Sequence, residues 1–428
     1  METTLKFGKN GLNVNLSDDL KVSVISKAPM PILNDPVKAV ETALSNPIEC
    51  DSLDKLAGPN KTACILICDI TRPVPNNLIL PSLLKNLIHN GLKPQNITIL
   101  IATGLHRPNE GPEMQELIGN DWVLKTVNVV NHFARNDHEH VSIGTTSRNT
   151  PIKLDRRFVE ADLKIVTGLV EPHLMAGWSG GRKVIAPGIA HRDTITSFHS
   201  SRYMEHPKCA LCILDGNPLH EDQVEIVHML GGALAVNVVL DDERRPTFFN
   251  FGNILASHYK AIDFAKKYTI VPIAKKFNTV VTSAAGYPLD KTYYQTVKGM
   301  VGALDILKPG GNLIIASECS EGLGSPEYAI AQQKLLNLGS EGFIDTVQKQ
   351  KFAEIDEWQT QMLVKPMRLG KVHLYTDSLS QEDLVLTGVN ITPSVEKAIE
   401  QSVRETMDTE VAIIPEGPYV VPSFSTNH

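Results

Sequence analysis

The sequence predicts an α/β protein of two domains, each built on a mostly parallel, doubly wound sheet. Short apolar runs, several of them ending in a polar residue, recur along the chain and are typical of strands buried on both faces. Helix-like stretches separate the runs, and strands that alternate with helices form parallel sheets with right-handed crossovers. The chain of 428 residues is long enough for two domains. The predicted strands lie at 63–69, 96–104, 123–132, 162–173, 278–286, 310–318, 371–377 and 410–417.

The remaining patterns place the domain boundary near residue 270. Alternating apolar and polar residues at 4–16, around a Lys-Asn-Gly turn, predict a β-hairpin at the start of the chain. Residues 233–253 predict a further strand pair, and 257–268 has the periodicity of an amphipathic helix. A new series of strands and helices follows. We therefore expect domains at 1–269 and 270–428.

Composition and charge exclude several classes of protein. A formal net charge of −7 argues against nucleic acid or an anionic membrane as the main partner. No run approaches the ~20 apolar residues of a membrane span, and the N-terminus lacks the apolar core of a signal peptide. The six cysteines are too few for a disulfide framework, which favours a reducing compartment. These observations predict a soluble, cytoplasmic protein.

Polar, titratable residues follow each predicted strand of the first domain. In parallel sheets ligands bind at the carboxyl ends of the strands. The sequence therefore predicts an active site at that edge of the first sheet. The residues at these strand ends are Asp69 and Arg72, His106 and Arg107, His132, and Glu171 and His173.

The stretch 165–199 concentrates reactive groups around a glycine-rich turn. His173 precedes the turn, Lys183 ends it, and His199 follows a helix-like segment. The turn is not a Walker A loop, because Val184 stands where Ser or Thr is required. Lys183 could contact a phosphate, form a Schiff base or attach a ligand covalently. Glycines leave room for a ligand to touch backbone amides, and here they are Gly177, Gly180, Gly181 and Gly188.

A second candidate site follows the first strand of the second domain. Residues 286–290, GYPLD, end that strand, and a helix carrying Tyr294, Gln295 and Lys298 should follow. Gln295 and Lys298 are three residues apart and share one helix face. Near a helix start, an amide and an ammonium on one face can bind a carboxylate. From this segment alone an ordinary exposed helix face is the better interpretation.

Two pairs of metal-binding residue types have weak spacing. His138 and His140 form an H-x-H pair in a charged, loop-like stretch, which favours a solvated loop over a metal site. Cys209 and Cys212 form a C-x-x-C without a second pair, so zinc is weakly supported.

Taken together, the motifs resemble those of the nickel-dependent lactate racemase family. Single motifs are weak, but the set spans most of the chain in the order of that family. The matching motifs are DITRP (69–73), ATGLHRP (102–108), EPH (171–173), SGGRK (179–183), His199 and GYPLD…YQ..KG (286–299).

The resemblance implies a cofactor, a nickel-pincer nucleotide that holds nickel through two sulfurs and a pyridinium carbon. Lys183 matches the lysine that tethers this pyridinium-3,5-bisthiocarboxylic acid mononucleotide, and His199 matches the protein ligand of nickel. Soft sulfur and carbon donors with one imidazole suit nickel. The implied partners are a small-molecule substrate and the enzymes of the same host that make the cofactor.

The resemblance also implies roles for the remaining residues. His106 and His173 match two catalytic histidines. The stretch Asp69, Ile70, Thr71 and Arg72 matches residues that contact cofactor and substrate. Substrate contacts on the second domain are matched by Tyr294, Gln295 and Lys298. The implied site lies in the cleft between the domains.

The implied reaction is racemisation or epimerisation of a 2-hydroxy acid, either lactate or a larger 2-hydroxycarboxylate. Direct removal of the α-proton is hard because that hydrogen is weakly acidic. Hydride transfer to a pyridinium avoids the carbanion, while a histidine takes the hydroxyl proton. Each enantiomer needs its own base, which accounts for two histidines.

Two other classes of protein remain open. A nucleotide-dependent transferase would use the glycine-rich turn for phosphates and Asp69 for Mg²⁺, and would act without nickel. A non-catalytic ligand-binding protein would use the histidines only to hold a ligand, and would turn over no 2-hydroxy acid.

Overall fold

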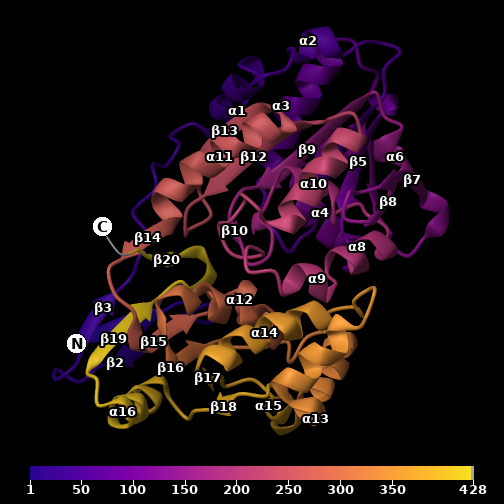
Figure 1. Ribbon diagram of the computed structural model, residues 1–428. Helices are drawn as coiled ribbons and strands as arrows, with labels where there is room; N and C mark the ends of the chain where they lie inside the picture. Colours follow the sequence, from indigo (N-terminus) through magenta and orange to yellow (C-terminus); the bar gives the residue numbers. More distant parts are fainter. Residues whose placement is uncertain (426–428) are drawn as a thin grey trace. The chain divides into compact units, whose positions relative to one another are not determined.

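The computed structural model describes residues 1–425, which form two compact units. The central unit comprises Pro29–Phe198 and Lys208–Lys267. Of the described residues, the terminal unit comprises Met1–Ala28, His199–Pro207 and residues 268–425. Each unit contains one six-stranded sheet. Figure 1 labels β5, β9, β12 and β13 of the central sheet and β3 and β15 to β19 of the terminal one. The predicted fold class is confirmed.

The sheet of the central unit has the strand order β13-β12-β9-β4-β5-β6 and is parallel except for β13. The predicted strand pair is the antiparallel β12–β13 hairpin. The strands are β4 Ala63–Cys68, β5 Ile97–Ala102, β6 Asn128–Asn131, β9 Leu163–Leu169, β12 Leu234–Leu240 and β13 Pro246–Asn253. Shorter strands are β7 His140–Thr145, β8 Pro151–Asp155, β10 Pro172–His173 and β11 Gly177–Trp178.

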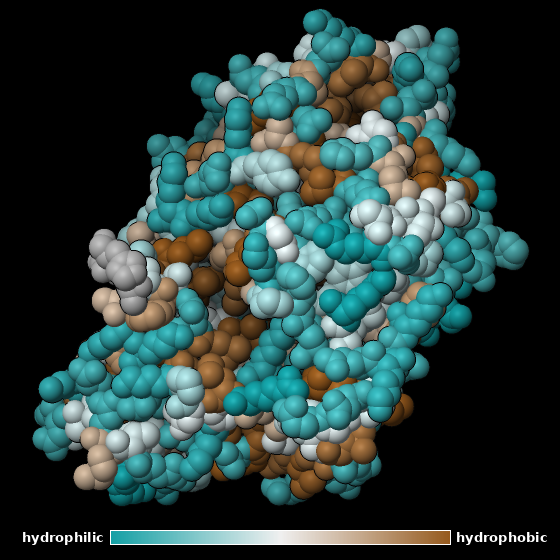
Figure 2. All heavy atoms as spheres, viewed as in Figure 1, coloured by the Kyte–Doolittle hydropathy of each residue, from teal (hydrophilic) through white to brown (hydrophobic). Residues whose placement is uncertain are grey.

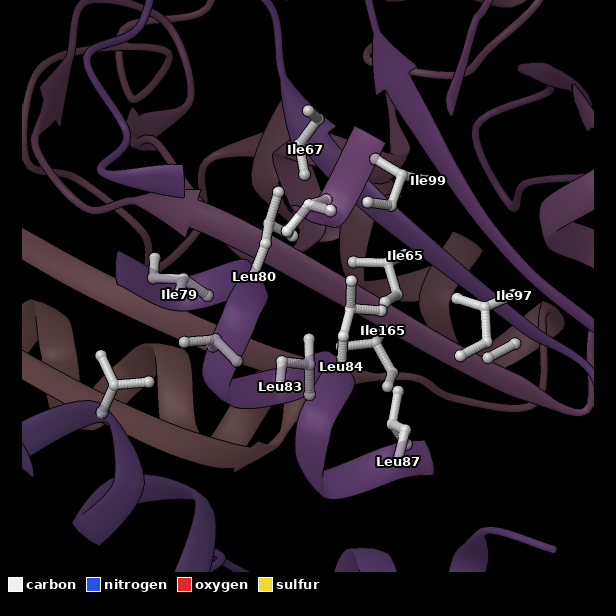
Figure 3. Close-up of a cluster of buried hydrophobic side chains, with 14 of the residues drawn as sticks. Ile65, Ile67, Ile79, Leu80, Leu83, Leu84, Leu87, Ile97, Ile99 and Ile165 are labelled. Atoms are coloured by element: carbon white, nitrogen blue, oxygen red, sulfur yellow. The ribbon is translucent and has the colours of Figure 1, made fainter. Parts of the chain in front are cut away.

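Helices of the central unit pack on this sheet because their apolar faces match its buried strands. Figure 3 shows Leu80, Leu83 and Leu84 of helix α3 against isoleucines of β4, β5 and β9. Burying each such side chain contributes roughly 1.5–3 kcal/mol. The helices are α1 Pro36–Ser45, α2 Leu53–Leu56, α3 Asn76–His89, α4 Pro112–Ile118, α5 Asp121–Thr126, α6 Arg156–Val159, α7 Arg182–Ile185, α8 Arg192–Phe198, α10 Pro218–Met229 and α11 Ile254–Thr269.

The predicted strand at 123–132 is wrong in its first half. Helix α5 occupies Asp121–Thr126, and only Asn128–Asn131 form β6. The Asn120 side chain accepts a hydrogen bond from the Val123 amide at 3.2 Å. This N-cap satisfies a backbone donor at the first turn, and it starts the helix.

The terminal unit has the strand order β18-β17-β16-β15-β19-β3, all parallel. Its strands are β1 Glu2–Leu5, β2 Leu12–Asn15, β3 Lys21–Val24, β14 Ile270–Ile273, β15 Phe277–Ser283, β16 Leu307–Ala316, β17 Lys371–Tyr375, β18 Asn390–Ile391, β19 Glu410–Ile414 and β20 Val421–Phe424. Its helices are α9 Ser201–Met204, α12 Tyr293–Gly302, α13 Pro326–Gln348, α14 Glu357–Leu369, α15 Gln381–Leu386 and α16 Val395–Thr406.

Two segments predicted in the first domain belong to the terminal unit instead. The N-terminal hairpin β1–β2 is confirmed, but its buried Leu5 and Val14 pack in the core of the terminal unit. Strand β3 then pairs with β19. Residues 199–207 contact helix α14, where Gln361 donates to Ser201 at 3.0 Å. Both segments reach elements far along the chain, which local sequence patterns do not reveal. Near the predicted boundary at 269/270, the units divide between Lys267 and Tyr268.

Burial of apolar residues in the two cores leaves a mostly hydrophilic surface. On the face drawn in Figure 2, hydrophilic residues cover most of the surface and hydrophobic residues form smaller patches among them. Within residues 1–425, no helix combines the length and the hydrophobicity that crossing a membrane requires.

Candidate active site

The carboxyl ends of four neighbouring strands carry most of the predicted site residues. Strands β9, β4, β5 and β6 are adjacent and parallel in the central sheet, so their carboxyl ends share one edge. The loops after these strands hold Asp69 to Arg72, His106, His132 and Glu171 to His173. The predicted polar edge of the sheet is therefore confirmed.

Asp69 and His106 form a carboxylate–imidazole pair across β4 and β5. Nδ1 of His106 lies 2.6 Å from Oδ2 of Asp69, which is buried, whereas about half of the His106 side chain (53%) is exposed. Burial raises the pKa of the Asp69 carboxyl, but hydrogen bonds from His106 and Thr71 outweigh it and hold that pKa below its usual value. The ionised carboxylate accepts the Nδ1 proton, so Nε2 is the basic nitrogen of a neutral His106.

The rest of the stretch after β4 is fixed by local contacts. The backbone amide and the hydroxyl of Thr71 both donate to Oδ1 of Asp69. The Ile70 amide donates to the Asn109 side chain at 3.3 Å. Nε of Arg72 lies 3.6 Å from a carboxylate oxygen of Glu171. A substrate carboxylate at Arg72 would therefore share or displace Glu171.

His173 has a different environment from His106. Its Nδ1 accepts hydrogen bonds from the backbone amides of Met175 and Ala176, both at 3.2 Å. A neutral imidazole has one N–H, so in this conformation its proton is on Nε2. The turn that supplies these amides is the short antiparallel pair β10–β11, where His173 lies opposite Gly177.

Packing within the protein explains why glycine occupies four positions of the 177–188 stretch. A Cβ at Gly177 would lie 2.2 Å from the Ile213 carbonyl oxygen, and one at Gly188 would lie 2.0 Å from that of Val184. At Gly180 and Gly181 a Cβ would also lie under 3.0 Å from protein atoms. At these four positions neighbouring chain occupies the space that a Cβ would need, so packing by itself requires glycine there, and contact of a ligand with these backbone amides stays a prediction.

Lys183 lies in helix α7, directly after the glycine-rich turn. Its side chain is partly exposed, yet burial of the amino group, aided by the charge of Arg72, lowers its pKa to about 8. A lysine with such a pKa is partly unprotonated near neutral pH and can act as a nucleophile. This environment fits covalent attachment of a ligand.

Arg182 is a structural residue next to Lys183 for which the sequence predicted no role. It is fully buried and donates to the carbonyl oxygens of Ala176 (2.9 Å) and Trp178 (3.4 Å). Its other terminal nitrogen lies 3.3 Å from Nδ1 of His258, whose Nε2 lies 2.7 Å from the Ser179 carbonyl oxygen. The guanidinium thus fastens the turn between His173 and Lys183 to helix α11. A polar turn with an arginine offers no sequence signal for this burial.

The terminal unit carries the second group of predicted residues on helix α12. The helix begins after Thr292, whose side chain accepts from the Gln295 amide. Gln295 and Lys298 lie three residues apart on this helix, as predicted. Oε1 of Gln295 is buried and has no hydrogen-bond partner within residues 1–425. A buried amide oxygen in this state can accept a hydrogen bond from a ligand.

Trp358 of α14 links His199 to Tyr294 within the terminal unit. The His199 and Trp358 rings are 4.4 Å apart between centroids, tilted by 36°. Nε1 of Trp358 donates to the Tyr294 hydroxyl at 3.1 Å. Trp358 was not among the residues predicted from the sequence, since a single tryptophan inside an amphipathic helix gives no sign of its partners.

The residues of the two weaker metal motifs lie in different surroundings. His138 is exposed, as expected, but His140 is buried, so the solvated-loop interpretation is wrong for His140. Cys209 is buried and donates to the Met175 carbonyl oxygen. Over the part of the chain that the structure describes, no three His, Cys, Asp or Glu side chains group as a metal site.

Comparison with known proteins agrees with this fold. The model of the lactate racemase N-terminal domain matches residues 7–211, and that of the lactate racemase C-terminal domain matches 273–421. The lactate racemase of Thermoanaerobacterium thermosaccharolyticum is 34% identical over 97% of this chain and 98% of its own length. That of Lactiplantibacillus plantarum is 31% identical over 90% of each chain.

Solved structures show the same relationship. The lactate racemase apoprotein from T. thermosaccharolyticum superposes with a TM-score of 0.92 at 30% identity, covering 99% of this chain and 100% of that one. A Thermotoga maritima protein with a TM-score of 0.67 and 18% identity shares the fold, over 91% of this chain and 97% of its own. The chain is thus an α/β enzyme of the isomerase class. It belongs to the lactate racemase family.

Proposed function

We propose that the chain racemises or epimerises a 2-hydroxy acid, with lactate as the first candidate and a larger 2-hydroxycarboxylate as the second. The observation that carries the proposal is the Asp69–His106 pair at the carboxyl edge of the central sheet, in the same unit as Lys183 of helix α7. A carboxylate-backed imidazole is a general base suited to a hydroxyl proton. The relatives named lactate racemase supply the substrate class.

We further propose a covalently held nickel-pincer nucleotide as cofactor. The chain fits such a group in two respects. Lys183 has the lowered pKa of an attachment point. No cluster of three metal ligands occurs within residues 1–425, so a metal bound through His199 alone needs its other donors from the cofactor. When bound, the pyridinium supplies a hydride acceptor and donor.

The residues of the chain then have the following proposed roles. His106 accepts the hydroxyl proton of one enantiomer at Nε2, and His173 serves the other enantiomer. Asp69, Ile70 and Thr71 shape the cofactor side of the site. Carboxylate contacts are assigned to Arg72, Tyr294, Gln295 and Lys298. That residues of both units act on one substrate stays a prediction, as does the cytoplasmic location.

One experiment tests activity and cofactor together. The full chain is produced in a host with and without the enzymes that make the cofactor. We expect a mass increase on Lys183, bound nickel, and racemisation of D- or L-lactate or of a larger 2-hydroxy acid only in the first case. Activity without nickel, or tight ATP binding with no racemisation, would support the transferase alternative. Loading with no turnover of any 2-hydroxy acid would leave a ligand-binding protein.

A further inference from the structure

His132 joins two segments of the candidate active site through its backbone and its side chain. Its amide donates to the Ile101 carbonyl oxygen at 3.1 Å, at the end of β5. Its own carbonyl oxygen accepts from the Thr103 hydroxyl at 2.7 Å. The Thr103 carbonyl oxygen in turn accepts from the His106 amide at 2.9 Å. The backbone of His132 is thus bound to the loop that carries His106.

The side chain of His132 contacts the segment that follows Lys183. Its Nε2 lies 3.1 Å from the carbonyl oxygen of Ala190, and its Nδ1 lies 3.2 Å from Oδ2 of Asp155. A second hydrogen bond joins the loop of His106 to the same segment, from the Gly104 amide to the Gly188 carbonyl oxygen at 2.9 Å. The imidazole and this backbone bond therefore tie the two segments together at neighbouring points.

Both ring nitrogens of His132 face groups that only accept hydrogen bonds. A carbonyl oxygen has no proton to donate. Asp155 is ionised, because burial raises its pKa but hydrogen bonds from Arg157 and His132 outweigh this and lower that pKa to about 2. A neutral imidazole has a single N–H and could satisfy one of the two acceptors. Asp155 already accepts three hydrogen bonds from Arg157, so the buried Ala190 carbonyl oxygen is the acceptor that depends on an N–H of His132, and leaving it unpaired is unfavourable by roughly 1–3 kcal/mol.

The groups around the His132 ring are another histidine and several ion pairs. The ring of His140 meets His132 edge-on at 5.0 Å, and its Nδ1 lies 2.7 Å from the Asn136 carbonyl oxygen. Burial lowers the pKa of His140, so it is neutral beside His132. Arg157 pairs with Glu139 at 3.0 Å and with Asp155 at 2.5 Å. His191, whose pKa is lowered by burial, lies 2.9 Å from Asp137 and 3.3 Å from Asp193, and Lys153 also binds Asp193.

We propose that His132 is a positioning residue that, through its backbone and its Nε2–H, holds the loop carrying His106 in register with the segment following Lys183. The inference rests on the proposed function for the importance of that register. The hydrogen bonds of His132 to both segments are present in the protein without any substrate. Displacing a catalytic group by about 1 Å can lower a rate ~100-fold.

Two substitutions distinguish the roles of the Nδ1 and Nε2 atoms of His132. His132→Gln keeps a donor near the position of Nε2 and can still reach Ala190, whereas His132→Asn keeps one near Nδ1 and reaches only Asp155. With the cofactor-loaded enzyme we expect His132→Asn to lower kcat ~10- to 100-fold with a smaller change in KM, and His132→Gln to stay within ~3-fold. His138→Gln, in the same loop but exposed, is the matched control and should leave kcat unchanged.

Two measurements need no activity. Ring nitrogen NMR of the wild-type enzyme should show His132 with a proton on Nε2, facing the Ala190 carbonyl oxygen. Amide exchange at Gly104 should be faster in His132→Asn than in His132→Gln. A ring without a proton on Nε2 would overturn the proposal, and so would an equal loss of kcat in both variants in proportion to lost stability. If the wild type racemises no 2-hydroxy acid, the proposed function fails. The NMR and amide-exchange results still test whether His132 joins the two segments.

Discussion

The two candidate catalytic histidines follow strands on either side of β4, but their environments differ in charge. His106 has its Nδ1 against the carboxylate of Asp69, whereas Nδ1 of His173 accepts from two backbone amides. The carboxylate accepts the Nδ1 proton of His106, whereas the two amides leave the proton of a neutral His173 on Nε2. The same residue type at similar places in the fold thus carries its proton on opposite nitrogens.

This difference bears on a two-base reaction. His106 can accept a proton at Nε2 without rearrangement. His173 in the observed conformation carries its neutral-state proton on Nε2, so it must leave the amides of Met175 and Ala176 before Nε2 can act as a base. We expect the half-reaction served by His106 to be the faster one.

The largest effect should come from removing the attachment point that both histidines depend on. Lys183→Ala should abolish covalent cofactor retention and racemisation of both enantiomers. The protein should still fold, because the partly exposed Lys183 side chain lies outside the apolar cluster around the central sheet. Intact mass and a racemisation assay measure this. Lys125→Ala, an exposed lysine of the same unit, is the control, and full activity in Lys183→Ala would rule out the tether.

Removing each candidate catalytic histidine in turn tests whether the two serve different enantiomers. His106→Ala and His173→Ala should each lower racemisation ~100- to 10,000-fold in both directions, because net inversion needs both bases. Each variant should keep the half-reaction of the enantiomer whose base remains. Single-turnover assays with each enantiomer, following the pyridinium absorbance, would show it. If both variants lose the same half-reaction, one base serves both enantiomers.

A milder change makes His106 resemble His173. Asp69→Asn replaces the carboxylate by a neutral amide, and should slow the half-reaction served by His106 by ~10- to 100-fold while sparing the other. Rates with separate enantiomers measure the asymmetry. An equal loss for both would indicate a structural role for Asp69 instead.

The lowered pKa of Asp69 also predicts a change of stability with pH. Because the folded-state pKa lies below the unfolded value of about 3.9, the pair stabilises the fold above that pH. This contribution is lost as the pH falls through the folded-state pKa. Urea unfolding of wild type and Asp69→Asn from pH 3 to 7 should show that the free energy of unfolding falls more steeply with acid in the wild type.

The smallest effect concerns Lys183 in the protein without cofactor. Its folded-state pKa of about 8 lies below the unfolded value of about 10.4, so the unfolded chain binds more protons between these values. Stability should therefore rise slightly with pH between about 8 and 10. Lys183→Met should lack this rise in thermal unfolding. A rise of equal size in Lys183→Met would show that other groups cause it.

Much of the molecule could be predicted from local patterns. Buried parallel strands are continuous apolar runs, and each strand ends where a polar residue follows, so the sheet edge with Asp69, His106 and His173 was visible in the sequence. Helix α12 with Gln295 and Lys298 was equally predictable, since three-residue spacing determines a shared helix face. In such cases a few neighbouring residues contain all the information that the prediction needs.

Only the tertiary structure decided which atoms these residues meet. The N-terminal strand β3 pairs with β19, near the opposite end of the chain. Gly177 is small because Ile213 packs on it, Trp358 meets His199, and His140 is buried. The proton positions of His106 and His173 follow from a distant carboxylate and a local turn, respectively. Hydrogen bonds and close packing join residues that are remote in the chain. The periodicity of the sequence does not identify such partners.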